Sequence, residues 1–135
     1  MLVTGGDDTI VRVFTLKGNA VIETNELKGP CLPVTGVDLL HNLQRVCATS
    51  KDGNAYIFDI KSKQIVDKVC FKYKPDMKNM VMRACAFKDD GSLLTLCVTP
   101  REPSFMIKWK QQGTKYQPEQ SAQVHKMAST GLRLS

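Results

Sequence analysis

The stretch VCATSKDGNAYIFDIKSKQIV, Val46 to Val66, decides the fold of this chain. An apolar run leads into Lys51–Asn54, a second apolar run covers Ala55–Ile60, and a third begins at Ile65 after a short polar break. The Asp-Gly pair in the first break favours a tight hairpin, because glycine readily adopts the positive φ that such turns need. The stretch therefore predicts three short antiparallel strands joined by tight turns.

The same pattern occurs elsewhere in the chain. TGGDDTIVRVF, Thr4 to Phe14, aligns with ATSKDGNAYIF, Ala48 to Phe58, at a shift of about 44 residues. In this alignment two aspartates, Asp8 and Asp52, share one position, and Phe14 and Phe58 share another. The polar turn at Lys51–Asn54 is thus one of a series of equivalent turns in the chain.

A second alignment extends the repeat to the C-terminus. The segment from Val34 to Thr49 aligns with the segment that starts at Met82, at a shift of about 48 residues. STGLRLS, Ser129 to Ser135, repeats the start of this pattern once more, so that Leu132 falls on Cys85 and Leu134 on Phe87. A period in the forties with four short strands per unit is typical of propeller blades.

The predicted fold class is therefore all-β, a β-propeller, with about two full and two partial blades in this chain. Because the chain begins in a second strand and ends in a first strand, and a ring needs about four blades or more, we expect it to be a fragment of a larger protein. The outer strand of the third blade is weakly defined, near Tyr116–Val124. The predicted blades cover residues 1–28 (partial), 34–74, 82–124 and 127–135 (partial).

Composition excludes several classes of protein. With 135 residues, 42% hydrophobic and 24% charged, the chain suits one ordinary globular domain. It contains no run of 18 apolar residues and no signal-peptide pattern at the N-terminus. The net charge of +6 permits nucleic-acid binding. The scattered lysines favour solubility instead, and those expected on an outer strand would block unwanted strand pairing: Lys61, Lys63, Lys68, Lys72 and Lys74.

The cysteines indicate a reducing environment. Five are present, and no C-x-x-C pair occurs. Four of them sit inside apolar runs, which favours buried, reduced thiols over a disulfide framework or a zinc site. The four are Cys47, Cys70, Cys85 and Cys97; the fifth is Cys31.

No catalytic, cofactor-binding or metal-binding residue is predicted. The chain has no phosphate-binding loop, dinucleotide fingerprint, zinc-protease motif or serine-nucleophile motif. His41 falls in a predicted strand turn and His125 in a predicted link between blades, and neither has metal-ligand neighbours at a suitable spacing. Gly5-Gly6 fits a turn, and Trp109 occupies the repeat position of Phe58 and is expected in the core.

Two kinds of turn are singled out. Asp52-Gly53 and Asp90-Gly91 are predicted structural turns. TPREPSFM, Thr99 to Met106, replaces the tight turn of the other blades with a longer loop. Function often resides on extra loop length, so this loop is the candidate partner-contact surface. Its candidate contact residues are Arg101, Glu102 and Pro103.

Three segments of the sequence resemble a known family. LVTGGDDTIVRVF, Leu2 to Phe14, resembles the WD-repeat pattern. RACAFKDDGSLLTLCVTPREPSFMIKWK, Arg83 to Lys110, is similar to the middle blades of one WD-repeat group. That group is the endoplasmic-reticulum exchange factor for the Sar-type small GTPase, the prolactin regulatory element-binding protein family of animals. VHKMASTGLRLS, Val124 to Ser135, looks like its next blade.

The resemblance implies a seven-bladed propeller on the cytosolic face of the endoplasmic reticulum membrane, held there by a C-terminal helix that this chain does not contain. It implies a Sar-type GTPase as partner and, indirectly, the COPII coat of ER-to-Golgi transport. The family binds a potassium ion in a glycine-rich loop of its first blade, and no residue here matches that loop. No catalytic residue can therefore be carried over, and we expect no nucleotide exchange by this chain alone. The alternatives are a WD-repeat scaffold with another partner and a nuclear, DNA-binding regulator.

Overall fold

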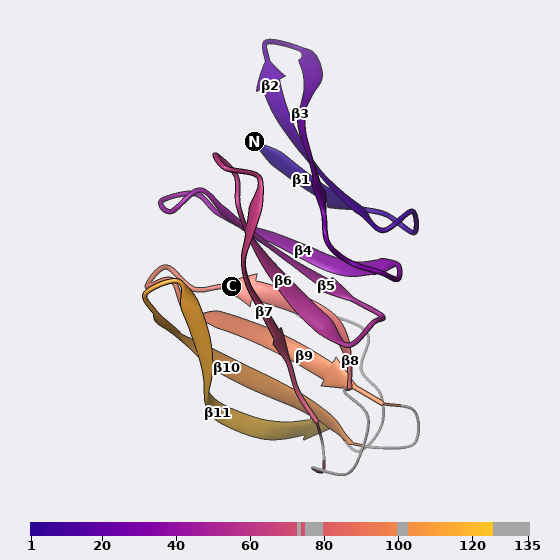
Figure 1. Cartoon of the computed structure of the whole chain (residues 1–135), viewed down its shortest axis with the longest axis vertical. Coiled ribbons are helices and arrows are strands. Elements are labelled where there is room, and N and C mark those ends of the chain that lie inside the picture. The colour runs from indigo at the N-terminus through magenta and orange to yellow at the C-terminus, as the bar shows by residue number, and fades with distance from the viewer. Residues whose placement is uncertain (73, 75–79, 100–102, 126–135) are drawn as a thin grey trace.

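The computed structural model describes residues 1–72, 74, 80–99 and 103–125, and every regular element in these ranges is a β-strand. Figure 1 shows three twisted sheets that follow one another along the long axis of the molecule. The strands are β1 (Leu2–Gly5), β2 (Ile10–Lys17), β3 (Ala20–Lys28), β4 (Val34–Leu40), β5 (Arg45–Ser50), β6 (Asn54–Asp59), β7 (Gln64–Cys70), β8 (Val81–Phe87), β9 (Leu93–Val98), β10 (Ser104–Gln112) and β11 (Lys115–His125).

Each sheet is an antiparallel meander. The first sheet has the order β1-β2-β3, the second β4-β5-β6-β7 and the third β8-β9-β10-β11. Consecutive strands pair with their neighbours in the chain, as short hairpin connections require. The predicted all-β architecture, with four strands in a complete unit, is confirmed.

Register irregularities occur at the same place in each sheet. The pairing of β2, β6 and β10 with the following strand shifts directly before Phe14, Phe58 and Trp109. A β-bulge changes the twist and direction of a strand, so its recurrence gives the three sheets the same shape. The inner strands β4 and β8 share a second irregularity, at Val34/Gly36 and Met82/Ala84.

Two apolar cores lie between successive sheets. Phe58 and Tyr56 of β6 pack with Val11 and Val13 of β2. On the other face of β6, Ile57 packs in a cluster with residues of the third sheet. The middle strand of the second sheet is therefore buried on both faces, as its uniformly apolar sequence predicts. Trp109 is also buried, and its indole N–H donates to Thr95 Oγ1 at 2.9 Å.

Side chains of the second sheet also bind the backbone of the third. Thr35 Oγ1 donates to the carbonyl of Met82 at 2.6 Å. Asp38 Oδ2 accepts from the N–H of Phe87 at 2.6 Å. At the outer edge, Asp67 Oδ2 accepts from the N–H of Tyr116 at 2.7 Å. These bonds connect the inner strands and the outer strands of the two sheets and set their separation.

Replacement of Asp67 by Ala is expected to lower the free energy of unfolding by about 1–3 kcal/mol, because the N–H of Tyr116 loses its acceptor. Lys115 also approaches Asp67, at 3.8 Å, but its side chain is 67% exposed. Lys115→Ala is the control and should cost less than about 0.5 kcal/mol. Urea denaturation of both variants measures the difference. Equal losses of stability would assign the effect of Asp67→Ala to its ion pair with Lys115 and not to the hydrogen bond from Tyr116.

Three sequence-based expectations are wrong. Cys70 is exposed, because Val69 occupies the inward-facing position at the end of β7. Of the lysines expected on the outer strand, only Lys68 lies in β7; Lys61 and Lys63 precede it, and Lys72 and Lys74 follow it. The outer strand expected near Tyr116–Val124 is confirmed as β11, an 11-residue strand paired along β10. His125 lies not in a link but at the end of β11, opposite Ser104.

Candidate functional site

The turns fall into two groups at opposite ends of the sheets. In an antiparallel meander successive turns alternate between the two ends. Residues 6–9 and 51–53 join second to third strands, and residues 29–33 link the first sheet to the second. These segments lie at one end, which we call the link end, because the start of β4 at Val34 pairs with the end of β5 at Ser50.

Asp52 organises the link end of the second sheet. Its Oδ2 accepts from the backbone N–H of Cys31 at 3.0 Å and from the hydroxyl of Tyr56 at 2.7 Å. Its Oδ1 accepts from the backbone and side-chain nitrogens of Asn54 at 2.9 and 3.1 Å. One carboxylate thus holds together its own turn, a middle strand and the link from the first sheet. The following residue, Gly53, has φ 91°, the conformation that glycine allows.

The network changes the acid–base properties of both partners. Partial burial opposes ionisation of Asp52, but the hydrogen bonds from Cys31, Tyr56 and Asn54 outweigh it and lower the pKa of the carboxyl. Burial, and then the negative charge of Asp52, raise the pKa of Tyr56. At neutral pH the pair is therefore an ionised acceptor and a neutral donor, as the hydrogen bond between them requires.

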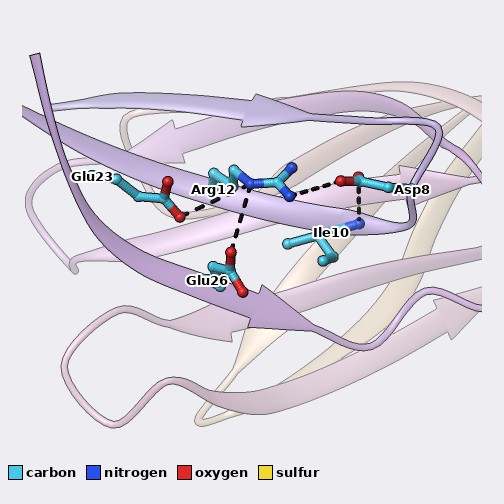
Figure 2. A network of polar contacts seen from close by, with 5 residues as sticks. All are labelled: Asp8, Ile10, Arg12, Glu23 and Glu26. Atoms are coloured by element: carbon cyan, nitrogen blue, oxygen red, sulfur yellow. Dashed lines mark hydrogen bonds and ion pairs between the residues drawn. The ribbon is translucent and has the colours of Figure 1, made fainter.

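The first sheet repeats this arrangement with an ion pair (Figure 2). Asp8, the repeat equivalent of Asp52, accepts from the N–H of Ile10 at 3.2 Å and from Arg12 Nη2 at 2.7 Å. Arg12 also lies 3.9 Å from Glu23 and 3.8 Å from Glu26. The hydrogen bond to Arg12 is the main cause of the lowered pKa of Asp8. Sequence reasoning noted the aspartates but not their partners, although both partners lie four residues further on.

The third sheet has a different turn. Counting back from the bulge residue Trp109, Pro103 takes the place that Asp52 and Asp8 hold before Phe58 and Phe14. Pro103 is half-buried and directly precedes β10. The other two candidate contact residues, Arg101 and Glu102, lie outside the described residues. No aspartate clamp forms at this position, which agrees with the longer loop in the sequence.

Asp90 and Gly91 lie at the end of the sheets opposite the link end, because they join the first and second strands of the third sheet. Asp90 Oδ1 accepts from the N–H and the hydroxyl of Ser92, and these bonds lower the pKa of Asp90. Gly91 has φ 89°. The two Asp-Gly turns that look alike in sequence therefore face different sides of the molecule.

The described residues contain no group of three or more His, Cys, Asp or Glu that could hold a metal ion. His41 lies in the turn between β4 and β5, and its carbonyl accepts from Gln44. Buried thiols are Cys47, Cys85 and Cys97, and burial raises the pKa of the Cys97 thiol to about 12. Within the same residues, no helix is long and apolar enough to cross a membrane.

Two shallow depressions mark the face of the third sheet that points away from the second. They measure about 230 and 210 Å³, and Lys108 lines both. Lys108 pairs with Glu119 at 3.2 Å. Asp90 and Ser92 line one depression, where the hydroxyl of Ser92 donates to the carboxylate of Asp90, and neither depression is lined by a histidine.

Comparisons with known proteins support the fold. No model of a protein family matches the sequence, and no curated protein matches it. Among solved structures 341 chains match, so the fold is common and does not single out a function. A chain from the structure titled "Crystal Structure of Mitotic Checkpoint Complex" matches with TM-score 0.73 and 10% identity. The match covers 96% of this chain and 37% of that one.

The chain thus spans little more than a third of the length of this structural neighbour. The neighbour is a WD40 propeller, and its likeness extends over all three sheets of this chain. Combined with the recurring bulges and the antiparallel four-stranded units, this establishes the fold as that of successive blades of a WD-repeat β-propeller, as the sequence predicted.

Proposed function

We propose that this chain is part of a WD-repeat guanine-nucleotide exchange factor that activates a Sar-type small GTPase. The observation that carries the proposal is the resemblance of Arg83–Lys110 to the middle blades of that group. This segment covers β9 and most of β8 and β10, and thus contributes to three of the four strands of the third sheet. The propeller fold supports the proposal at a coarser level, because the group consists of propellers.

The third sheet also carries the feature that separates it from the other two. Its turn has Pro103 where the first and second sheets have Asp8 and Asp52. Pro103 has no carboxylate, so it cannot accept the hydrogen bond by which Asp52 is tied to the preceding link. A loop of this kind on a rigid sheet is a usual position for partner contacts. We propose it as one contact of the GTPase.

An exchange factor acts by binding the nucleotide-free GTPase more tightly than the nucleotide-bound form. It shifts the switch segments that hold Mg²⁺ and phosphate, and nucleotide is released. The family's potassium-binding loop has no counterpart among the residues of this chain, so no step is assigned to an ion here. The proposed location is the cytosolic face of the endoplasmic reticulum membrane, where the activated GTPase would recruit the COPII coat.

Nucleotide release tests the proposal. The longest protein encoded by a transcript that contains this sequence is identified, and its cytosolic part is expressed. This protein is mixed with a Sar-type GTPase loaded with a fluorescent GDP analogue. We expect release to accelerate at least tenfold, and the 135-residue chain alone to give no acceleration. Replacing the sequence Arg101-Glu102-Pro103 by Gly-Ser-Gly in the long protein should reduce the acceleration, while its thermal unfolding temperature stays the same. No acceleration by the long protein would refute the proposal.

The second candidate is a WD-repeat scaffold with another partner. It is favoured by the structural neighbour, which comes from a multi-protein complex. It predicts binding without any effect on nucleotide release. A DNA-binding role is the third candidate and rests on the net charge of +6. It requires that affinity for duplex DNA falls steeply with salt concentration, because each neutralised phosphate releases counterions. Affinity that does not change with salt excludes it.

A further inference from the structure

The outer edge of the second sheet carries a concentration of positive charge. This edge consists of the turn at residues 60–63, strand β7 and the two residues that follow it (Figure 1). It contains four lysines and one aspartate, and all four lysines are exposed: Lys61, Lys63, Lys68 and Lys72. The first and third sheets pack on either side of the second, so the position of this edge is set by described residues alone.

The outer strands of the other two sheets lack this charge. Strand β3 carries Glu23 and Glu26 against one lysine, and both glutamates lie near Arg12. Strand β11 has one lysine and one glutamate. Lysines on any outer strand would hinder unwanted pairing, and that role does not require one edge of three to hold most of the charge. The difference points to a role that is specific to the second sheet.

The carboxylates near this edge do not neutralise its lysines. Asp67 has a side chain that is only 12% exposed, and its Oδ2 accepts from the N–H of Tyr116 in the third sheet. Asp59 lies at the start of the turn, where its Oδ2 accepts from the N–H of Ser62 at 3.0 Å and Arg45 is its partner in β5. No lysine of the edge forms a salt bridge with another described residue. Their charges are available to an external anion.

The backbone of β7 does not favour the addition of another strand. The N–H of Lys68 donates to Asp67 Oδ1 at 2.8 Å, so a donor in the middle of the strand already has an acceptor. The pairing of β7 with β6 also has a register shift, at Val66. Such a bulge twists an edge away from a straight partner strand. The lysines of this edge therefore act through their side chains.

An exposed aliphatic side chain lies among the lysines. Ile65 is 44% exposed and lies three residues before Lys68. It pairs with Phe58, and Lys68 pairs with Tyr56; both aromatic side chains belong to the core between the first and second sheets. Cross-strand partners share a face of the sheet. Ile65 and Lys68 thus lie on the same face of β7, because the bulge between them adds one residue.

We propose that this edge binds the surface of a membrane that contains anionic lipids. We call it the basic edge and define it by five residues: Lys61, Lys63, Ile65, Lys68 and Lys72. Lysine ammonium groups attract anionic headgroups, and their long stems lie along the apolar boundary while the charges stay in water. An exposed aliphatic side chain such as Ile65 enters the boundary between headgroups and acyl chains, as in other proteins that bind a membrane surface.

A nucleic acid fits this edge less well than a membrane. Residues 60–72, all of which the structure describes, include no arginine and no exposed aromatic side chain. Arginine is the usual reader of guanine, and aromatic side chains stack on unpaired bases. An exposed isoleucine has no comparable use against a phosphate backbone. The combination of lysines with one aliphatic side chain therefore favours lipid headgroups.

Sedimentation with vesicles tests the proposal. The 135-residue chain is mixed with vesicles of phosphatidylcholine, either alone or with about one quarter phosphatidylserine. We expect it to bind only the vesicles that contain phosphatidylserine. A triple variant replaces Lys61, Lys63 and Lys68 by glutamine. It should bind these vesicles at least about tenfold more weakly, because each lysine near an anionic surface adds to the affinity.

A matched variant separates the basic edge from the net charge. Lys17, Lys51 and Lys110 are exposed and come from the first, second and third sheets, away from the basic edge. Their replacement by glutamine lowers the net charge by the same amount, and this variant should retain most of the binding. Equal weakening of the two triple variants would attribute binding to net charge and overturn the proposal. Failure of the wild type to bind phosphatidylserine vesicles would also overturn it.

Ile65 distinguishes a membrane from a nucleic acid. Ile65→Ser should weaken binding to the phosphatidylserine vesicles at least about threefold and leave the affinity for duplex DNA unchanged. Ile22→Ser is the control, because Ile22 is 42% exposed on the outer strand of the first sheet, and it should bind like the wild type. Unchanged vesicle binding by Ile65→Ser would contradict the proposal.

Duplex DNA serves as the competing ligand. If the triple variant of the basic edge loses affinity for duplex DNA but not for the vesicles, the edge binds nucleic acid and the proposal is wrong. The proposal does not rest on the exchange activity, and no GTPase is present in these measurements. Their outcome is therefore independent of the nucleotide-release experiment.

Discussion

Phe58→Ala is expected to lower the free energy of unfolding by about 3–5 kcal/mol. The side chain of Phe58 is fully buried in the core between the first and second sheets. It stacks against Tyr56 with ring centroids 6.4 Å apart. Its removal leaves a cavity that strands fixed by pairing on both sides cannot close. Because domains of this size are stable by only about 5–15 kcal/mol, the change removes a large part of the total.

The repeat provides a matched control for this prediction. Phe14 occupies the same position next to the bulge in the first sheet, but it is half-buried and lies on the open face. Phe14→Ala should cost clearly less than Phe58→Ala. Guanidinium denaturation followed by circular dichroism measures both. Equal losses for the two phenylalanines would mean that the core between the sheets is not formed as described.

Asp52→Ala is expected to cost about 2–3 kcal/mol, because the hydroxyl of Tyr56 and the N–H of Cys31 lose their acceptor together. Tyr56 is 3% exposed, so its hydroxyl depends mainly on the carboxylate of Asp52 for a hydrogen bond. Tyr56→Phe removes the buried donor along with the need for an acceptor, and it should be much less harmful. In a chain that already carries Tyr56→Phe, Asp52→Ala should lower the free energy of unfolding by less than it does in the wild type. A double-mutant cycle measures this difference.

The same network predicts a dependence of stability on pH. The pKa of Asp52 is lower in the folded chain than its ordinary value of 3.8. Its contribution is therefore fully present above about pH 4 and is lost as the pH falls through the folded-state pKa. Asp52→Asn should flatten the acid limb of the stability curve below pH 4 and leave its slope between pH 5 and 7 unchanged. An unchanged acid limb would show that the carboxylate is not the acceptor.

Local signals in the sequence were sufficient to predict the fold and part of the candidate site. The Asp-Gly turn at Asp52, the alternation of strands and the period of the repeat depend on neighbouring residues and on turn geometry, which one sequence records. The burial of Trp109 followed from its repeat position. What the period could not show is how each turn is held: Tyr56 and Arg12 stabilise equivalent turns by different chemistry.

The sequence by itself determined that this chain consists of propeller blades, because strand length, turn residues and period are local properties. Only the tertiary structure decided which residues connect one blade to the next. Asp38 binds Phe87 and Asp67 binds Tyr116, each 49 residues away, because stacking and twist of the sheets bring these groups together. The structure also placed His125 in a strand, opposite Ser104, and left Cys70 exposed at the end of β7. Contacts between sheets depend on how one sheet is displaced and rotated relative to the next. The residue pattern along a single strand does not specify this displacement.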